Sequence, residues 1–377
     1  MRNWLGRLAS LLIAGLCCAQ TTGPAEDAGV AVYVGKEMVK GYRPTPALVR
    51  KETPVVMPKF PVVDIHCHWS IYQDPVELIK AMDALGMSKA VDLSGGYGDY
   101  LDRMIEKFHM PYPDRVFVLC NIDWKKIDDP TFGQDVTAYL KSAKGKGASG
   151  LKIFKDLGLN VKDKTRKIVS IDDPRLEPVW KTCGELKMPI LMHSGDPVAF
   201  FQPVDEHNER WMQLKRHPDW TFYGPQFPTW EQVLQQHVSV IQKHPGTVFI
   251  SAHLANCGED LQRLASIMDR CPNMYADISG RVAEIGRQPY SARKFLIKYQ
   301  DRILFGTDRY PGRTDQERNS VYYRFLETDD EYFDYYNHPF PPEGEWKIYG
   351  VFLPDEVLKK IYHENADRAL AGEMPLH

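Results

Sequence analysis

Histidine and aspartate residues near residue 66 have a spacing that suits a metal ion. His66 and His68 stand two residues apart in the motif VVDIHCHW, and Asp64 precedes them by two residues. Residues two apart on a strand point to the same side, so the two imidazoles are expected to project together above Asp64. Ile65 and Cys67 are then expected to face the helices. Two imidazoles placed in this way can bind one metal ion, although an isolated H-x-H pair also occurs by chance.

Three further polar residues end later apolar runs. His193 lies in ILMHSG, His253 in ISAHLAN and Asp308 in ILFGTD. Each run has the composition of a strand in a barrel wall, so the three side chains are expected at the same rim. A single histidine of this kind is more often a hydrogen-bonded core residue. Four strand ends that all carry histidine or aspartate favour a metal site instead.

The elements that must position these residues alternate regularly. Apolar, β-branched runs predict strands, and helical patterns separate them, which is typical of parallel βα units. The expected strands cover residues 61–68, 89–95, 115–123, 149–154, 189–195, 247–254, 273–279 and 302–308. The expected helices cover residues 74–86, 99–108, 135–144, 174–187, 230–243, 259–271, 291–300 and 354–370. The sequence therefore predicts an α/β fold, a (β/α)8 TIM barrel with its catalytic face at the carboxyl ends of the strands.

A doubly wound open sheet is the alternative architecture. Such a sheet usually carries a glycine-rich phosphate-binding loop after its first strand. Here the first strand is followed by HWSIYQDP, which contains no glycine, and GGYG at residues 95–98 fits an ordinary turn. This difference favours the closed barrel.

Two connections are too long for simple turns. Residues 196–228 follow the fifth expected strand and residues 309–353 follow the eighth, and both are rich in aromatic residues. Both leave the carboxyl end of a strand, so we interpret them as aromatic-rich loops that cover a pocket. Surface decoration or a contact between two copies of the chain is the alternative, and a homodimer is left open.

Residues 1–19 are expected to be a secretory signal peptide. Arg2 and Arg7 accompany the apolar run LASLLIAGLCC, which is too short to span a bilayer, and Ala19 marks a cleavage position. An uncleaved anchor or a buried helix is the alternative. The mature protein is therefore expected to be exported, to the periplasm or the cell exterior, with no stable membrane span after cleavage.

Residues 20–58 are expected to form an extended leader, and residues 59–377 the barrel. Lipidation at Cys17 or Cys18 is left open. The five remaining cysteines have irregular spacing, so no disulfide framework is expected, and the sequence does not reveal any single pairing.

The composition excludes several classes of protein. Apolar residues make up 43% of the chain and charged residues 26%, which excludes a disordered or fibrous chain. The 47 basic and 50 acidic residues leave a net charge of −3. This near balance argues against a nucleic-acid binder that works by neutralising phosphates. The partner expected from the polar strand ends is a small-molecule substrate.

The motifs VVDIHCHW, LMHSG, ISAHLAN and FGTD, with the ending LPDEVLKKIYHENADRAL, resemble the amidohydrolase superfamily. The similar branch is the amidohydrolase-related one, which includes aminocarboxymuconate-semialdehyde decarboxylase, resorcylate-type decarboxylases, and lactone-hydrolysing and hydratase relatives. The resemblance implies one divalent metal, most often zinc, held by His66, His68, His193 and Asp308. Three neutral imidazoles and a carboxylate suit Zn²⁺ and leave an open position for water.

The resemblance also implies catalytic roles. A bound metal would lower the pKa of its water toward about 7. Asp308 accepts a proton from the water and returns it to a leaving group, and His253 polarises a carbonyl or orients the water. Many superfamily members bridge two metals with a carbamylated lysine on the fourth strand, where this chain has Lys152. A second metal is not expected here, because this branch usually uses one.

Charged residues at the same rim are candidates for substrate binding. Lys152 can hold a substrate carboxylate or make a salt bridge. Arg281 and Arg309 can clamp an acidic substrate or form structural ion pairs. TatD-type nucleases have a similar start but use a glutamate on the fourth strand, and SGLKIFKD contains none.

Three functions follow in order of preference. The first is a metal-dependent hydrolase that directs activated water at a small ester, lactone or amide. The second is a non-oxidative, metal-dependent decarboxylase of a small aromatic or unsaturated carboxylic acid. The third is a binding protein that keeps the barrel without the chemistry.

Overall fold

The computed structural model describes residues 32–34, 37–39, 45–309, 315–336 and 343–376. The chain divides into two units, residues 1–49 and 50–377. In the first unit, the short strands β1 (Val32–Val34) and β2 (Glu37–Val39) pair in antiparallel fashion. The expected signal peptide, with Cys17 and Cys18, lies outside the described residues, so the expected export of the protein stays a prediction.

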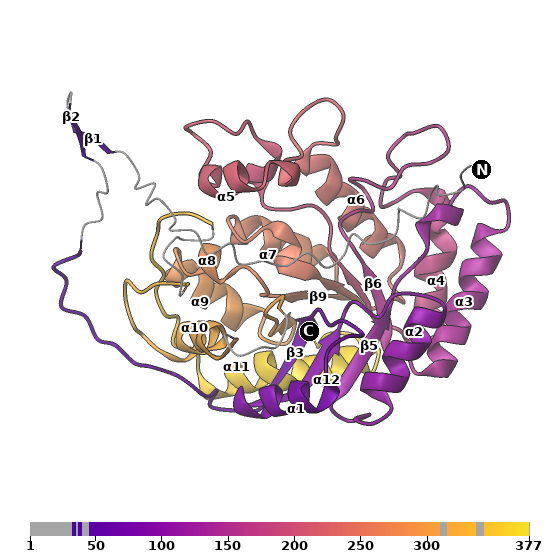
Figure 1. Ribbon diagram of the computed structural model, residues 1–377, viewed down its shortest axis with the longest axis horizontal. Helices are drawn as coiled ribbons and strands as arrows, with labels where there is room; N and C mark the ends of the chain where they lie inside the picture. Colours follow the sequence, from indigo (N-terminus) through magenta and orange to yellow (C-terminus); the bar gives the residue numbers. More distant parts are fainter. Residues whose placement is uncertain (1–31, 35–36, 40–44, 310–314, 337–342, 377) are drawn as a thin grey trace, which may run out of the picture. The chain divides into compact units, whose positions relative to one another are not determined.

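The second unit contains one sheet of eight parallel strands whose order in the sheet follows the chain (Figure 1). All eight expected strands are present. Their bounds are β3 Val62–Cys67, β4 Met87–Asp92, β5 Val116–Cys120, β6 Gly150–Ile153, β7 Ile190–Met192, β8 Phe249–Ser251, β9 Met274–Asp277 and β10 Ile303–Leu304.

Backbone hydrogen bonds join the two outer strands of this sheet. The N–H of Ile65 donates to the carbonyl of Phe305 at 3.1 Å, and the N–H of Asp308 donates to the carbonyl of His66 at 2.9 Å. The N–H of His68 donates to the carbonyl of Arg309 at 3.2 Å. The segment after β10 therefore pairs with β3, and the predicted TIM barrel is confirmed.

Helices cover the outside of the strands (Figure 1). Their bounds are α1 Pro75–Ala84, α2 Asp99–Met104, α3 Phe132–Lys146, α4 Glu177–Glu185, α5 Trp211–Arg216, α6 Trp230–Lys243, α7 Leu261–Arg270, α8 Val282–Ile285, α9 Pro289–Lys298, α10 Asp315–Glu327, α11 Asp355–Lys359 and α12 Asn365–Leu370. Local sequence explains where they begin. In α1, the Asp74 side chain caps the N–H of Val76 and Pro75 occupies the first turn, where it needs no hydrogen bond.

Two hydrophobic clusters separate the inside of the barrel from its outside. The inner cluster draws buried residues from seven of the strands, among them Ile65, Leu119 and Leu191. The outer cluster joins the other faces of the strands, including Cys67, to the helices. The expectation that Ile65 faces the helices is wrong. A β-bulge causes this, because three steps along β3, from Asp64 to Cys67, oppose two steps along β4.

The two long connections contain helices that the sequence did not predict. Helix α5 lies in the connection after β7, and α10 lies in the connection after β10. Many of their aromatic side chains pack into the outer cluster and are buried, namely Phe200, Phe222, Tyr322, Tyr323, Phe325, Phe333 and Tyr335. A covering role for these connections stays a prediction.

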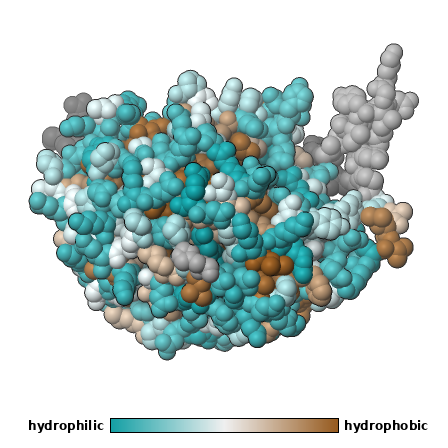
Figure 2. Space-filling view, turned by 180° about the vertical axis from the view of Figure 1, so that it is seen from behind, coloured by the Kyte–Doolittle hydropathy of each residue, from teal (hydrophilic) through white to brown (hydrophobic). Residues whose placement is uncertain are grey.

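The surface carries no single dominant apolar area in the view of Figure 2, where apolar residues form small groups among hydrophilic ones. Among the described residues, no helix is both long enough and apolar enough to cross a bilayer. The cysteines of the second unit are buried thiols. The homodimer left open by the sequence stays a prediction.

Candidate metal centre

Three of the predicted ligands meet at the carboxyl ends of the strands. Oδ1 of Asp308 lies 3.3 Å from Nε2 of His66 and 3.1 Å from Nε2 of His68. One ligand atom from each of the three residues fits within a group no wider than 4.8 Å. His66 is fully buried, whereas the side chain of Asp308 is 38% exposed. One buried imidazole, one partly buried imidazole and a partly open carboxylate form a donor set suited to a divalent metal with an accessible position.

The second nitrogen of each imidazole is held by another side chain. Nδ1 of His66 lies 3.0 Å from Oδ2 of Asp277 and 2.9 Å from Oγ of Ser279. Nδ1 of His68 lies 2.9 Å from Oγ of Ser94. A proton on Nδ1 of His66 can be donated in a hydrogen bond to Asp277. In this tautomer Nε2 carries the lone pair, which points toward Asp308. Contacts of this kind are typical of histidines that bind metals.

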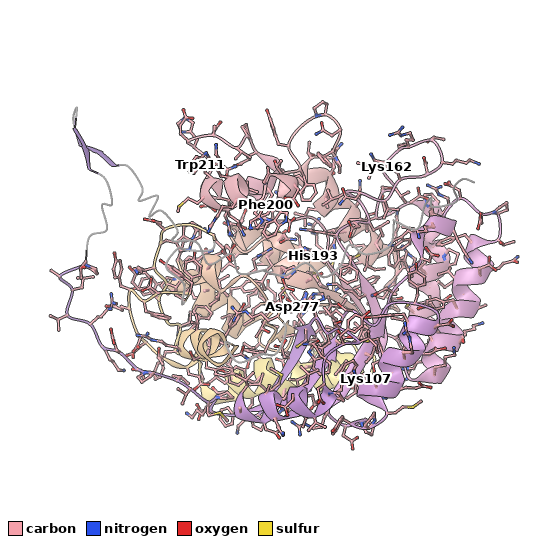
Figure 3. The ribbon with its side chains drawn as sticks, viewed as in Figure 1. Lys107, Lys162, His193, Phe200, Trp211 and Asp277 are labelled. Carbon is pink, nitrogen blue, oxygen red and sulfur yellow. The ribbon has the colours of Figure 1, made fainter. Side chains whose placement is uncertain are left out.

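His193 and His253 lie beside this group. The ring centres of His193 and His253 are 4.3 Å apart, and those of His66 and His253 are 4.7 Å apart. Nε2 of His253 lies 3.9 Å from Oδ2 of Asp308, while its Nδ1 lies 2.7 Å from the carbonyl oxygen of Ser279. His193 does not belong to the 4.8 Å group of ligand atoms. Figure 3 labels His193 and Asp277 in the middle of the second unit, with Trp211 and Lys162 toward its edge.

Two buried histidine nitrogens that make no hydrogen bond within the described part of the chain support a metal at this position. Nε2 of His66 and Nε2 of His193 are buried and make no hydrogen bond with any described residue, while the nearest carboxylate oxygens, from Asp308 and Asp196, lie 3.3 Å and 3.7 Å away. His237 on α6 is the opposite case, since its two nitrogens contact Oγ of Ser194 at 2.9 Å and Oγ of Ser251 at 2.8 Å. A buried polar atom without a partner is costly, so the two bare nitrogens fit a metal ion that would satisfy them.

The backbone is strained at two points of the site. His253, Leu254, Ala255 and Asn256 follow one another in the left-handed region, with φ between 53° and 57°, and Asp308 has a φ of 57°. This conformation costs roughly 1–2 kcal/mol for each residue with a side chain. Strain of this kind persists only where the surrounding structure imposes it, and it is common at functional sites.

Electrostatics keep His193, His253 and Asp308 in the forms that bind metals. Burial lowers the pKa of His193 well below its ordinary value, and Lys152 adds to the effect. Burial also lowers the pKa of His253, with help from His193. Burial alone would raise the pKa of Asp308, but the neighbouring His66 and His68 outweigh it and hold this pKa well below its usual range. Neutral imidazoles and an ionised carboxylate are the forms that coordinate a cation.

The position between the two carboxylates attracts positive charge. Burial and Lys152 both lower the pKa of His66, but Asp277 and Asp308 outweigh them and raise it. Burial opposes ionisation of Asp277 as well, yet His66 holds the pKa of that carboxyl below its ordinary value. The same field would favour a cation at Nε2 of His66.

The three predicted substrate-binding residues differ in the contacts that their charged groups make with the rest of the protein. Lys152 on β6 is 1% exposed, and its Nζ makes no hydrogen bond with a described residue. Burial lowers the pKa of Lys152 to about 8, while Asp308 and Asp277 oppose the effect. Arg281 donates to the carbonyl of Gly280 at 2.6 Å and also contacts Asn256. The guanidinium of Arg309 lies 5.7 Å from the ring centre of Tyr322.

Sequence reasoning missed the serines that hold the ligand histidines. The sequence pattern assigned no role to Ser94, Ser279 or Asp277. A signal for them existed, because DLSG and DISG each end an apolar run. A serine two residues after a buried aspartate is too common to be noticed without the tertiary contacts.

Comparisons with known proteins identify the family of the chain and match its fold. A sequence model of the amidohydrolase family matches residues 63–371. An uncharacterised TIM-barrel protein from Bordetella bronchiseptica has a similar fold, with 16% identity and a TM-score of 0.51, over 83% of this chain and 99% of the other. A search of curated protein sequences found no match.

Two decarboxylases of known structure also share the fold. A 2,6-dihydroxybenzoate decarboxylase from Rhizobium has 14% identity and a TM-score of 0.52, over 83% of this chain and 99% of the other. A dihydroxybenzoic acid decarboxylase from Polaromonas sp. JS666, solved with manganese and 2-nitroresorcinol, has 13% identity and a TM-score of 0.50, over 83% and 97%. At such low identity the similarity shows the fold alone.

Proposed function

Because the chain belongs to the amidohydrolase family, as its motifs predicted, we propose that it is a metal-dependent hydrolase of a small ester, lactone or amide. The observation that carries the proposal is the meeting of His66, His68 and Asp308 at the mouth of the barrel. The bare Nε2 atoms of His66 and His193 support it.

The proposed ligands are His66, His68, His193 and Asp308, and the expected metal is Zn²⁺. A divalent metal bound there would supply a lowered pKa for water and polarisation of a substrate carbonyl. Small side-chain movements would be needed to bring His193 into the group, since its ring already lies against that of His253. A second metal carried by a carbamate on Lys152 is not part of the proposal.

Asp308 and His253 are the proposed catalytic residues. Asp308 is the most accessible of the three residues that meet at the centre, and its low pKa keeps it ionised, which is the form that can accept a proton from the attacking water. Nε2 of His253 lies 3.9 Å from the second oxygen of Asp308, so one water or substrate oxygen placed to the side of the pair could hydrogen-bond to both atoms. Its Nδ1 is held by Ser279, so Nε2 is the atom available to orient that oxygen.

Lys152 is the proposed contact for an acidic group of the substrate. Its ammonium is buried and lacks a hydrogen bond among the described residues, so an anion from the substrate would satisfy it. Arg281 and Arg309 are weaker candidates, because described protein groups already contact both guanidinium groups.

A decarboxylase is the second candidate function. Two structural neighbours are decarboxylases of dihydroxybenzoates, and one of them holds manganese. The buried ammonium of Lys152 would suit a substrate carboxylate here also. In this reaction the bond between carbon and the carboxylate breaks, CO₂ leaves, and a proton is added to the carbon.

A product assay separates the candidates. Purified protein is analysed for metal and then incubated with lactones, esters, amides and hydroxybenzoates, while titratable acid and CO₂ are measured separately. Acid without CO₂ supports the hydrolase, and CO₂ without acid overturns it in favour of the decarboxylase. Protein without stoichiometric transition metal or turnover supports the binding protein.

The variant Asp308→Asn tests the catalytic assignment. It keeps an oxygen ligand but removes the base, so we expect turnover to fall by about 100-fold or more while metal occupancy falls much less. His363→Ala, in the C-terminal helical segment, is the control and should leave both unchanged. Equal losses of turnover and metal in Asp308→Asn would contradict a role as base.

A further inference from the structure

Two copies of one short motif flank the candidate metal centre. The sequence Asp92-Leu93-Ser94-Gly95 follows one apolar run, and Asp277-Ile278-Ser279-Gly280 follows another. In both copies the aspartate is the last residue of a strand, β4 or β9. We infer that these Asp-x-Ser-Gly motifs position the two histidine ligands at the end of β3, His66 and His68, an inference that rests on the proposed metal site.

The copy on β9 holds His66. Oγ of Ser279 lies 2.9 Å from Nδ1 of His66, and Oδ2 of Asp277 lies 3.0 Å from the same nitrogen. Oδ1 of Asp277 accepts the N–H of Ser279 at 3.0 Å, which fixes the turn that carries the serine. It also accepts the N–H of His253 at 3.0 Å. One buried carboxylate therefore positions a ligand histidine and the start of the left-handed turn at His253.

The copy on β4 holds His68 in a similar way. Oγ of Ser94 lies 2.9 Å from Nδ1 of His68. Oδ1 of Asp92 accepts the N–H of Ser94 at 3.1 Å and the N–H of Trp69 at 2.8 Å. Since Trp69 directly follows His68, the motif holds this histidine through its backbone and through its ring.

Both copies leave the same nitrogen of the histidine for the metal. An imidazole whose Nδ1 is hydrogen-bonded to a fixed partner presents Nε2 on its other side, in one ring orientation. In both His66 and His68, Nε2 is the atom that lies near Oδ1 of Asp308. The motifs therefore set the direction in which the two lone pairs point.

The two copies differ in one contact, and this difference predicts that they contribute unequally to metal affinity. Asp277 touches the ring of His66 directly, whereas the contacts of Asp92 are with the backbone N–H groups of Trp69 and Ser94. A carboxylate that accepts the Nδ1 proton raises the basicity of the ligand nitrogen as well as orienting it. Loss of the β9 copy is therefore expected to weaken metal binding more than loss of the β4 copy.

Gly306 lets the β9 copy reach His66, although the last strand of the barrel lies between β9 and β3. A Cβ atom on Gly306 would lie 3.1 Å from Cβ of His66 and 3.2 Å from Cβ of Ser279, closer than side chains normally pack. The missing side chain leaves the space in which the histidine and the serine meet.

Metal affinity measured on the whole protein tests this inference. Zn²⁺ binding is followed by competition with a chromophoric chelator, and the visible spectrum of the Co²⁺-loaded protein reports the ligand geometry. We expect Asp277→Asn and Ser279→Ala to weaken Zn²⁺ binding by about 10- to 100-fold, and Ser94→Ala by about 10-fold. Ser94→Thr keeps the hydroxyl and should restore the affinity.

Ser88→Ala is the matched control, because Ser88 lies on β4 and donates to the carbonyl of Val62 at 3.0 Å, before the strand reaches Asp92. It should leave the affinity and the Co²⁺ spectrum unchanged. Thermal unfolding of the metal-free variants separates a folding defect from a binding defect, and the serine variants remain informative if Asp277→Asn fails to fold.

The outcomes distinguish this inference from the proposed function. Tight stoichiometric binding by the wild-type protein, with unchanged affinity and spectrum in Ser279→Ala and Ser94→Ala, would overturn the positioning role and leave the metal site intact. A wild-type protein that binds no metal stoichiometrically would overturn the metal site and this inference together.

Discussion

Leu191 lies on β7 and His193 lies just beyond the end of that strand, yet the two residues belong to regions with opposite requirements. Leu191 is fully buried in the inner cluster of the barrel, where apolar side chains from neighbouring strands surround it. His193 lies just beyond the end of β7, and its Nε2 lacks a hydrogen bond among the described residues. The layer of Leu191 serves stability, whereas the mouth of the barrel keeps groups that only a ligand would satisfy.

The backbone shows the same difference. At the mouth, four consecutive residues from His253 to Asn256 adopt the left-handed conformation, and Asp308 does so as well. The strands beneath pair in regular parallel fashion from β4 to β10. The regular layer provides the stability that tolerates strain at the mouth, where the strain directs side chains toward one point.

His193→Ala should produce the largest effect on function. The variant removes a proposed ligand, so we expect metal occupancy and activity to be lost together, with kcat/KM lower by about 10³-fold or more. The free energy of unfolding of the metal-free protein should change little, because the lost nitrogen makes no hydrogen bond there. Metal analysis, kinetics and chemical denaturation measure the three quantities. Full occupancy and full rate in this variant would remove His193 from the ligand set.

Leu191→Ala should have the reverse effect. Truncation of a fully buried leucine leaves a cavity and is expected to lower the free energy of unfolding by about 2–5 kcal/mol. The folded fraction should still bind one metal per chain. Urea denaturation and metal analysis of the same sample check both parts, and Leu191→Met, which conserves volume, should cost much less. Loss of metal without loss of stability would show that the two regions are not separate.

The pH dependence of the free energy of unfolding should reveal the titration of His237, the buried histidine whose two nitrogens contact serine hydroxyls. Burial lowers the pKa of His237 to about 4, from 6.5. The unfolded chain therefore binds a proton at His237 more readily than the folded protein does. The contribution of His237 to the free energy of unfolding is fully present above about pH 6.5 and is lost as the pH falls from there toward 4. This single group would contribute about 3 kcal/mol to the loss.

His237→Gln isolates that contribution, since glutamine does not titrate. Unfolding free energies of the metal-free wild type and variant, measured between pH 7.5 and 4, should converge as the pH falls. Parallel curves would mean that His237 titrates normally in the folded protein.

Ala255→Gly should have the smallest effect. Glycine relieves roughly 1–2 kcal/mol of left-handed strain but loses about 0.5–1 kcal/mol through the greater freedom of the unfolded chain. We expect a stability within about 1 kcal/mol of the wild type, on the favourable side. Ala138→Gly, at an exposed position within α3, is the control and should cost about 1 kcal/mol. Equal destabilisation by both substitutions would argue against strain at Ala255.

Much of the barrel could be predicted because its signals are local. Apolar runs such as VVDIH and helical periodicity placed all eight strands, and the polar residues that end those runs pointed to the mouth. The bulge in β3 could not be predicted, because it depends on how β3 pairs with β4, and it placed Ile65 inside the barrel. Helices α5 and α10 were missed because both connections were treated as loops.

The sequence by itself determined that polar residues end the strands at the mouth of the barrel, since polarity at the end of an apolar strand is a property of a few neighbouring residues. Only the tertiary structure decided how those residues are held. Asp277 and His66 are 211 positions apart, and their contact requires the barrel to close and Gly306 to leave space between them. Contacts across non-neighbouring strands depend on the whole fold, and no local pattern encodes them.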